Sequence, residues 1–230
     1  MQILNVSNDE KVAMLRSNPY FTPLGAKELN ELANETSLRS YARGETVFWQ
    51  GDACAGLHIL HNGSVKLYKL SPKGRELIIR VLYPGATFNE VPVFDHGVNA
   101  VNVAAVEDSR IWLVPAPAIR GCMQANPAMA QVVIENLSKN LRMLVGVVEE
   151  LSFYQVTSRL ARLLGRLTPE QLQGQRITQD QLAAQLGTVR EVVARSLRDL
   201  ERSGAIRVSR RQIQVLDRVA LSAWAEEPCG

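Results

Sequence analysis

Three charged residues near the start of one predicted helix, Arg190, Glu191 and Arg195, have the types and the spacing to recognise base pairs. An arginine side chain can donate two hydrogen bonds to guanine O6 and N7, and a glutamate can accept one from the amino group of cytosine. The same residue types also occur on ordinary solvent-exposed helix faces. Their interpretation therefore depends on the elements that position them.

Residues 177–206 are predicted to form two helices joined by a glycine turn. The first helix covers about 179–185, and Gly187 ends it because glycine adopts a positive φ at little cost. The apolar residues expected on the buried faces of the two helices are Leu182, Ala183, Leu186, Val192, Val193, Leu197 and Leu200. Two capping boxes are predicted at the helix starts, Thr178 with Gln181 and Thr188 with Glu191. This is the pattern of a helix-turn-helix, whose second helix enters the major groove of DNA.

A β-hairpin with a basic tip is predicted directly after the second helix. Two short runs, 206–208 and 213–215, alternate apolar and polar residues on either side of a turn at Ser209, Arg210 and Arg211. Cations at such a tip are suited to contact a DNA phosphate. The residues expected to contact phosphates are Thr178, Gln179, Thr188, Arg210 and Arg211.

The basic charge of the chain is concentrated in its last third. Residues 155–230 hold 12 arginines and 8 acidic residues, which gives 12 − 8 = +4, whereas residues 1–154 hold 14 cations and 15 anions, which gives 14 − 15 = −1. The three cysteines, Cys54, Cys122 and Cys229, do not have the spacing of metal ligands. With no apolar run of membrane-spanning length and no signal peptide, the sequence predicts a cytoplasmic protein.

The residues from Leu38 to Val114 form short strand-like runs between glycine turns, among them 56–60, 65–70 and 77–82. Many short strands with frequent turns are typical of an antiparallel sandwich or jelly roll. Helical patterns precede this region and follow it. The predicted fold class is therefore α+β, with an N-terminal β-roll, a long helix and a C-terminal winged helix-turn-helix.

A long helix with a heptad pattern is predicted from Asn126-Pro127 to about Tyr154. Its apolar positions recur in alternating steps of three and four, as in the seam of a coiled coil between two chains. The predicted dimer seam consists of Val133, Leu137, Asn140, Leu144, Val147 and Leu151. The alternative, a helix lying on its own β domain, is supported by Met129, Val132, Leu141 and Val145, and both faces are expected to be used.

We therefore expect three parts: a sensor domain over 1–125, a dimerisation helix and hinge over 126–154, and a DNA-binding domain over 155–230. A homodimer would present two recognition helices to half-sites about 34–36 Å apart on the duplex, one helical turn. The expected operator is accordingly a palindrome.

The order of these parts, together with ARGETVFWQGDACAGLHILHNGSVKLYK (42–69), GRELIIRVLYPGATFNE (74–90) and YQVTSRLARLL (154–164), resembles the Crp/Fnr superfamily of bacterial transcription regulators. The resemblance implies that Arg190, Glu191 and Arg195 fill the base-reading positions of the cAMP receptor protein branch. It also implies TGTGA-like half-sites and RNA polymerase as a further partner. Val189 stands where that branch has a small hydroxyl residue near a phosphate, which puts that one contact in doubt.

The resemblance places an effector pocket at Phe88, Asn89, Glu90, Asn99, Ala100, Leu144 and Val145. Relatives that bind cyclic nucleotides have Phe-Gly-Glu and then Arg-Ser or Arg-Thr, in which the arginine holds the phosphate. Here Glu90 is retained, but Asn99-Ala100 supplies no cation, and burying an unpaired phosphate costs several kcal/mol. Leu144 and Val145 replace the Thr-Ser pair that contacts adenine. The sequence thus predicts an effector other than cyclic AMP.

Other sensor types remain as alternatives. An iron–sulfur cluster needs cysteines before the β-roll, and the first cysteine is Cys54. Haem stays open because His58, His61 or His96 could supply an axial ligand. A regulator that needs no effector is a further possibility. A cupin-type metalloenzyme would need converging histidines, which the spacing does not provide, so no enzyme activity is expected. The effector, any cofactor, the target genes and the choice between activation and repression do not follow from the sequence.

Overall fold

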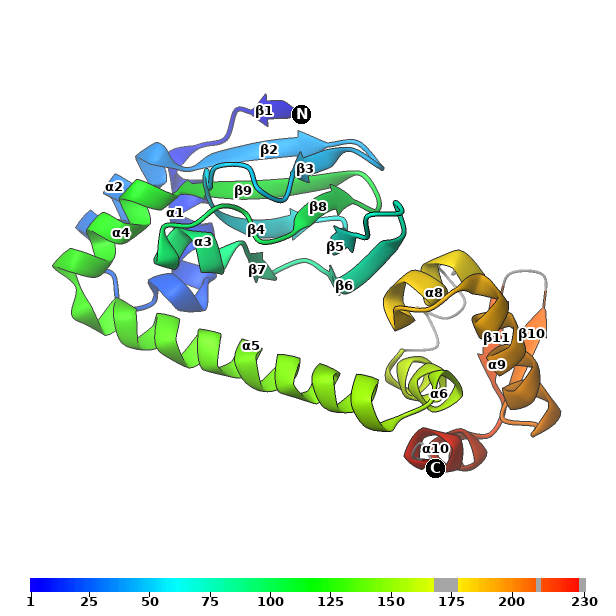
Figure 1. Cartoon of the computed structure of the whole chain (residues 1–230). Coiled ribbons are helices and arrows are strands. Elements are labelled where there is room, and N and C mark those ends of the chain that lie inside the picture. The colour runs from blue at the N-terminus through cyan, green and yellow to red at the C-terminus, as the bar shows by residue number, and fades with distance from the viewer. Residues whose placement is uncertain (168–177, 210–211, 228–230) are drawn as a thin grey trace. The chain divides into compact units, whose positions relative to one another are not determined.

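The computed structural model describes residues 1–167, 178–209 and 212–227, and it is shown in Figure 1. The described chain forms two compact units. The first unit comprises residues 1–69 and 79–140, and the second comprises residues 70–78 and 141–230. Each unit has its own hydrophobic core.

The first unit contains two antiparallel sheets, as the sequence predicts. One sheet has the strand order β1-β2-β9-β4-β7, and the other has the order β3-β8-β5-β6. In the first sheet β4 pairs with β9 over most of its length, with His58 opposite Leu113. The strands are β1 (Gln2–Leu4), β2 (Ser37–Tyr41), β3 (Thr46–Phe48), β4 (Gly56–Asn62), β5 (Val65–Leu70), β6 (Glu76–Leu82), β7 (Thr87–Phe88), β8 (Asn102–Ala105) and β9 (Ser109–Pro115).

The turn at Gly63 between β4 and β5 requires glycine for two reasons. Its φ is +84°, in the left-handed region that side chains disfavour. A Cβ atom at this position would also lie 2.3 Å from Ser109 Oγ and 2.6 Å from the Asp108 carbonyl oxygen. The close approach of this turn to the start of β9 therefore depends on the absence of a side chain.

Helices pack on the first unit and complete its core. They are α1 (Asn8–Ser17), a short 3-10 helix (Pro19–Phe21), α2 (Ala26–Glu35), α3 (Glu90–Asp95) and α4 (Ala116–Ala125). Leu15, Phe21 and Leu32 are fully buried against sheet residues such as Leu57 and Val114. A second cluster lies between the sheets and includes Phe88 and Ile111.

The predicted long helix is confirmed as α5 (Pro127–Phe153), a single helix of 27 residues. Its first turns pack on the first unit through Met129, Val133 and Leu137. Val133 was expected on the seam facing a second chain, and this expectation was wrong because the side chain is 3% exposed. Residues four apart share one helix face, so the stripe from Met129 through Val133 to Leu137 serves the chain's own core.

The later turns of α5 expose their apolar side chains. Leu141 and Val145 were expected to lie on the β domain, but they are 63% and 60% exposed. The exposed apolar residues of this stretch are Leu141, Met143, Leu144, Val145, Val147, Val148, Leu151 and Phe153. No helix in the described part of the chain is long and apolar enough to cross a membrane.

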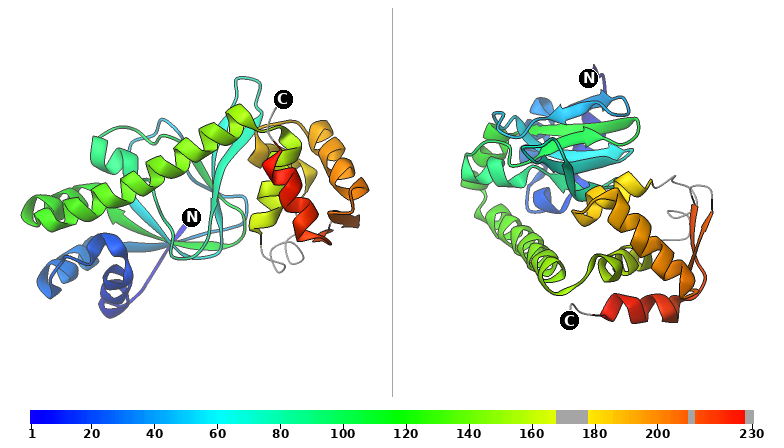
Figure 2. Two further views of the ribbon diagram at one scale, coloured as in Figure 1. Left: turned by 90° about the horizontal axis from the view of Figure 1, so that it is seen from below. Right: turned by 45° about the vertical axis from the view of Figure 1, so that its right-hand side comes forward.

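The second unit is a helical domain with a small hairpin. Its elements are α6 (Val156–Arg166), α8 (Gln179–Leu186), α9 (Arg190–Arg202), β10 (Ile206–Ser209), β11 (Gln212–Val215) and α10 (Arg218–Glu226). Figure 2 shows α10 packed along α6. Leu160, Leu182 and Leu200 are fully buried in the shared core. The winged helix-turn-helix is therefore present, with the added helix α10 that the sequence pattern did not predict.

Candidate DNA-binding surface and effector pocket

The first helix of the helix-turn-helix, α8, begins and ends as the sequence predicts. Thr178 Oγ1 accepts a hydrogen bond from the Gln181 amide at 3.1 Å, and the Gln181 side chain accepts one from the Thr178 amide at 2.8 Å. Gly187 ends the helix with a φ of +64°. Both capping partners are thus engaged within the protein, and the turn has the sharp geometry that the motif needs.

The second helix, α9, begins differently from the prediction. Its N-cap residue is Val189, which has no side-chain acceptor, and no side-chain capping bond forms there. The predicted capping box of Thr188 with Glu191 was therefore wrong. With Thr188 one residue before the N-cap, its hydroxyl and the Glu191 carboxylate take no part in capping this helix.

The three predicted base-reading residues share the exposed side of α9. At about 100° per residue, Arg190, Glu191 and Arg195 lie within an arc of about 140°. All three side chains are exposed. Val193 and Leu200, on the opposite side, are buried in the core of the second unit. Arg198 also lies on the exposed side, and the sequence reasoning missed it, although its helical spacing could have revealed it.

Helix α6 fixes the other two helices by polar contacts as well as by apolar packing. Arg159 Nη1 donates to the Leu186 carbonyl oxygen at 2.9 Å, which satisfies an acceptor at the C-terminal end of α8. The hydroxyls of Thr157 and Ser196 are 2.9 Å apart and join α6 to α9. The angle between α8 and α9 is thereby held by groups away from the exposed face.

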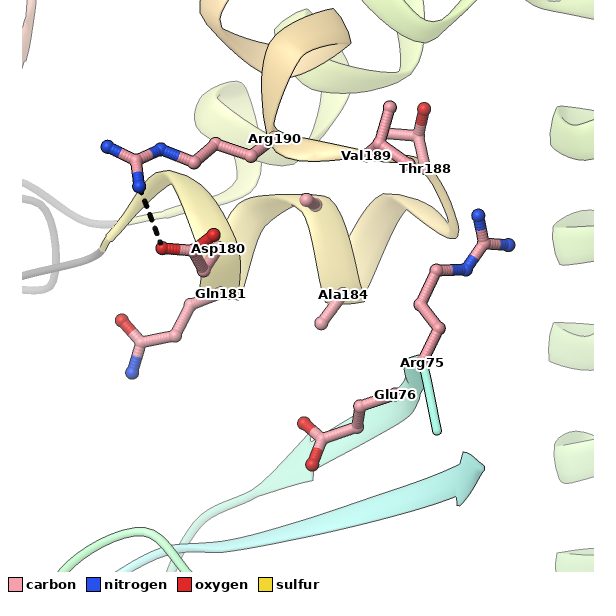
Figure 3. Close-up of a pocket in the computed structure, with 9 residues that line it drawn as sticks. Arg75, Glu76, Asp180, Gln181, Ala184, Thr188, Val189 and Arg190 are labelled. Carbon is pink, nitrogen blue, oxygen red and sulfur yellow. Dashed lines mark ion pairs between the residues drawn. The ribbon is translucent and has the colours of Figure 1, made fainter. Parts of the chain in front are cut away.

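Arg190 has an acidic neighbour on α8. Asp180 Oδ2 lies 3.7 Å from Arg190 Nη1, and the two side chains are 70% and 62% exposed. Figure 3 shows the two side chains pointing toward each other from the starts of their helices. The sequence reasoning did not single out Asp180. The position of the carboxylate becomes apparent only when the glycine turn brings the two helix starts together.

The predicted phosphate contacts are only partly described. Thr178 is exposed, whereas Gln179 and Thr188 are half-buried. The hairpin strands β10 and β11 pair antiparallel, with Ile206 opposite Val215, which confirms the predicted wing. Arg210 and Arg211 lie outside the described residues.

Two asparagines of the predicted effector pocket bind each other. Asn89 has a φ of +71°, an uncommon conformation for a residue other than glycine. Its Nδ2 donates to Asn99 Oδ1 at 3.0 Å and to the Gly56 carbonyl oxygen at 3.2 Å. Asn99, which is 2% exposed, donates in turn to the Trp49 carbonyl oxygen at 3.3 Å. The structure thus brings together Asn89 and Asn99, and their side chains are engaged with the fold.

Glu90 has a partner that the sequence did not reveal. The Tyr20 hydroxyl donates to Glu90 Oε1 at 3.3 Å, across a separation of 70 residues. Burial raises the pKa of Glu90, and the hydrogen bond from Tyr20 opposes that rise. Burial, followed by the charge of Glu90, raises the pKa of Tyr20.

The remaining pocket residues are placed separately. Phe88 is buried and stacks on His58, with ring centroids 5.1 Å apart. Ala100 is exposed. Leu144 and Val145 are exposed residues of the second unit. Cys54, which the sequence reasoning did not assign to this region, lies 3.6 Å from Asn89 Nδ2 through its Sγ.

These residues do not fit the anionic phosphate of a cyclic nucleotide. Asn89 and Asn99 are neutral and already bonded to each other. An anionic group buried without a counter-charge is strongly disfavoured.

The histidines do not form an evident haem or metal site. His58 is 3% exposed, and its ring centroid lies 5.1 Å from those of both Phe48 and Phe88. A haem bound to His58 would therefore have to displace these packed side chains. His61 packs edge-on against Trp112, and His96 is exposed. Within residues 1–167, 178–209 and 212–227, no three His, Cys, Asp or Glu side chains are placed to hold a metal ion.

The comparison with known proteins agrees with this two-part arrangement. Residues 38–126 match the cyclic nucleotide-binding domain family, and residues 158–224 match the Crp-like helix-turn-helix domain family. The chain is 27% identical over 212 residues to the cyclic AMP receptor protein of Thermus thermophilus, which covers 92% of this chain and 98% of the relative. It is 25% identical over 209 residues to the global nitrogen regulator of Synechococcus elongatus, covering 85% of this chain and 93% of the relative.

A solved structure supports the same fold. A transcriptional regulator of the Crp/Fnr family from Eubacterium rectale, described as putative, matches with a TM-score of 0.78 and 22% identity, covering 91% of this chain and 98% of that one. Both family models match in the order that the two units follow along the chain. Together these matches show that the chain belongs to the Crp/Fnr superfamily of transcription regulators.

Proposed function

We propose that this regulator is a homodimer that reads a palindromic operator with TGTGA-like half-sites. The observation that carries the proposal is the position of Arg190, Glu191 and Arg195 on the exposed side of a helix whose other side is buried. A helix held in this way presents its charged side chains to a groove without losing its packing. We assign base reading to these three residues and phosphate contact to Thr178, Gln179, Thr188, Arg210 and Arg211.

The exposed apolar stretch of α5 supports the homodimer. Leu144, Val147 and Leu151 are 44%, 42% and 55% exposed at heptad spacing. A row of this kind is stabilised when a second copy of the helix covers it, and Asn140 on the same seam favours a parallel, in-register pair. The seam then runs from Asn140 to Leu151, because Val133 and Leu137 pack on the core of their own chain. We retain 1–125, 126–154 and 155–230 as the functional parts, a cytoplasmic location, and RNA polymerase as a further partner.

We further propose that the first unit responds to an effector other than cyclic AMP. The Asn89–Asn99 hydrogen bond and the absence of an arginine at 99 support this proposal. We assign binding of a small, largely apolar molecule to Phe88, Asn89, Glu90, Asn99 and Ala100 of the first unit. Leu144 and Val145, which the resemblance added to this pocket, belong to the second unit and are left out of this assignment. Control follows if that molecule binds two states of the dimer with different affinity. A regulator without any effector is the second candidate, favoured because the polar side chains at 89 and 99 are already satisfied within the fold.

The DNA-reading proposal is tested by comparing Arg190→Ala with Arg210→Ala. Binding is measured by fluorescence anisotropy on the TGTGA palindrome, on duplexes with one symmetric guanine replaced, and on a scrambled duplex. Arg190→Ala is expected to cost about 1–3 kcal/mol on the palindrome and to relax the preference at one guanine. Arg210→Ala is expected to weaken all duplexes alike, as a phosphate contact would. Equal losses on palindrome and scrambled DNA for Arg190→Ala would reject its base-reading role.

The effector proposal is tested with the purified full-length chain. Isothermal titration with cyclic AMP is expected to give no saturable binding below about 1 mM, because the phosphate lacks a counter-charge. Native mass spectrometry of the same preparation tests for a co-purified molecule. Micromolar binding of cyclic AMP would refute the proposal. Tight, specific operator binding with no bound molecule and no additive would favour the effector-independent candidate.

A further inference from the structure

The carboxylate of Asp180 contributes little to holding the fold, because an exposed negative charge in the first turn of a helix adds at most about 1 kcal/mol. Its distance of 3.7 Å from Arg190 Nη1 and the exposure of both side chains describe a surface ion pair, a type that adds little to stability. The start of α8 is capped by Thr178 and Gln181, and its end is bound by Arg159. Removing the Asp180 charge therefore leaves the helices in place and changes the electrostatic environment of Arg190.

A carboxylate beside Arg190 affects a base edge and a phosphate differently. Guanine O6 and N7 are neutral acceptors, and the five N–H donors of a guanidinium allow one to face Asp180 while others face the base. A phosphate carries a full negative charge, which Asp180 repels. The paired arginine is also already neutralised within the protein, so it releases one counterion fewer on meeting the DNA backbone.

We propose that Asp180 is a specificity-determining residue, which orients Arg190 for a guanine edge and keeps it from binding phosphates indiscriminately. The inference rests on the base-reading role proposed for Arg190. Asp180 acts through Arg190 as a positioning residue, and its main effect is to weaken binding to DNA without the operator sequence.

The test is Asp180→Asn, which keeps the shape of the side chain and removes its charge. The matched control is Asp199→Asn, which removes the same charge from an ion pair on α9, where Asp199 Oδ1 lies 3.6 Å from Arg202 Nη1. Nine residues along a helix place Asp199 about 14 Å from Arg190. Affinity is measured for the TGTGA palindrome and for a scrambled duplex across a series of salt concentrations.

Asp180→Asn is expected to make the salt dependence of scrambled-DNA binding steeper by about 0.9 in log–log slope, which is about an eightfold gain in affinity at about 0.1 M salt. On the palindrome the same variant is expected to change affinity by less than about threefold, so the specificity ratio falls. Asp199→Asn and the charge-conserving Asp180→Glu are expected to keep the ratio of the wild type. An unchanged ratio in Asp180→Asn, or an equal fall in Asp199→Asn, would overturn the inference.

The double variant Asp180→Asn, Arg190→Ala separates the two proposals. If Asp180 acts through Arg190, removing its charge has no further effect once the arginine is absent. If the single variant Arg190→Ala leaves guanine preference intact, the base-reading proposal fails. If Arg190→Ala relaxes that preference but Asp180→Asn leaves the ratio unchanged, only the role of Asp180 fails.

Discussion

The buried imidazole of His58 is expected to make the first unit sensitive to acid. The side chain lies in the core with its ring 5.1 Å from both Phe48 and Phe88. Its Nδ1 has no hydrogen-bond partner among the described residues. Burial lowers the pKa of His58 from 6.5 to about 3, with a smaller lowering by the Arg39 charge. The folded chain therefore keeps this imidazole neutral at any pH in which the protein is normally handled.

The direction and size of the effect follow from proton linkage. Below pH 6.5 the unfolded chain binds a proton at His58 that the folded chain does not bind, so stability is lost as the pH falls from 6.5 toward 3. Between pH 7 and pH 5 the loss due to this one group amounts to about 2 kcal/mol. Other groups, such as Glu90, titrate as well, but they are common to the wild type and to a variant at position 58.

The assay compares His58→Leu with the wild type and with His61→Leu, a control on the same strand whose side chain is exposed. Urea unfolding is followed at pH 7, 6 and 5 by hydrogen exchange in peptides from β4 and β9, so that only the first unit is read. The wild type and His61→Leu are expected to lose about 2 kcal/mol more than His58→Leu between pH 7 and pH 5. The same pH dependence in all three proteins would refute the buried neutral imidazole.

Three further predictions concern a turn in the first unit, the proposed dimer seam and a hydrogen bond within the second unit. Gly63→Ala is expected to destabilise the first unit by about 2 kcal/mol more than Gly85→Ala in urea unfolding, because both glycines have positive φ but only a Cβ at 63 meets other atoms. Leu144→Glu is expected to raise the dimer dissociation constant at least about 100-fold in sedimentation velocity, because it places a charge on the seam. The control variant Lys139→Glu changes the exposed outer face of the same helix and is expected to leave the dimer intact. A dimeric Leu144→Glu would exclude this seam. Arg159→Met is expected to lower the stability of the second unit by about 1–2 kcal/mol in thermal unfolding, because the Leu186 carbonyl loses its donor; an unchanged melting temperature would contradict that role.

The local signals in the sequence predicted the elements that depend on a few neighbouring residues. Thr178 with Gln181 and the glycine at 187 define α8 because caps act within one turn of helix. The same rule failed at Thr188, since the chain is still extended at Val189, which itself becomes the N-cap. A capping motif therefore locates a helix start to within a residue or two, and the tertiary context decides between neighbours.

Contacts between distant segments could not be predicted in the same way. The hydrogen bond from Tyr20 to Glu90 joins a 3-10 helix to α3 within the first unit. The residues next to each of them in the sequence give no indication of this partner. The Asp180–Arg190 pair depends on the turn angle at Gly187. Helix α10 could have been predicted, because Leu221, Trp224 and Ala225 have helical spacing. In the structure these residues pack in the core of the second unit.

The paired amides at 89 and 99 restrict how this first unit can change its chemistry over evolutionary time. An arginine introduced at 99 would remove the acceptor for Asn89 Nδ2, because a guanidinium group donates hydrogen bonds and accepts none. Orphaned polar groups of this kind are costly in a protein interior. A lineage that acquires an affinity for anions at this place therefore needs a coordinated replacement at 89, and single-substitution intermediates pass through a less stable protein.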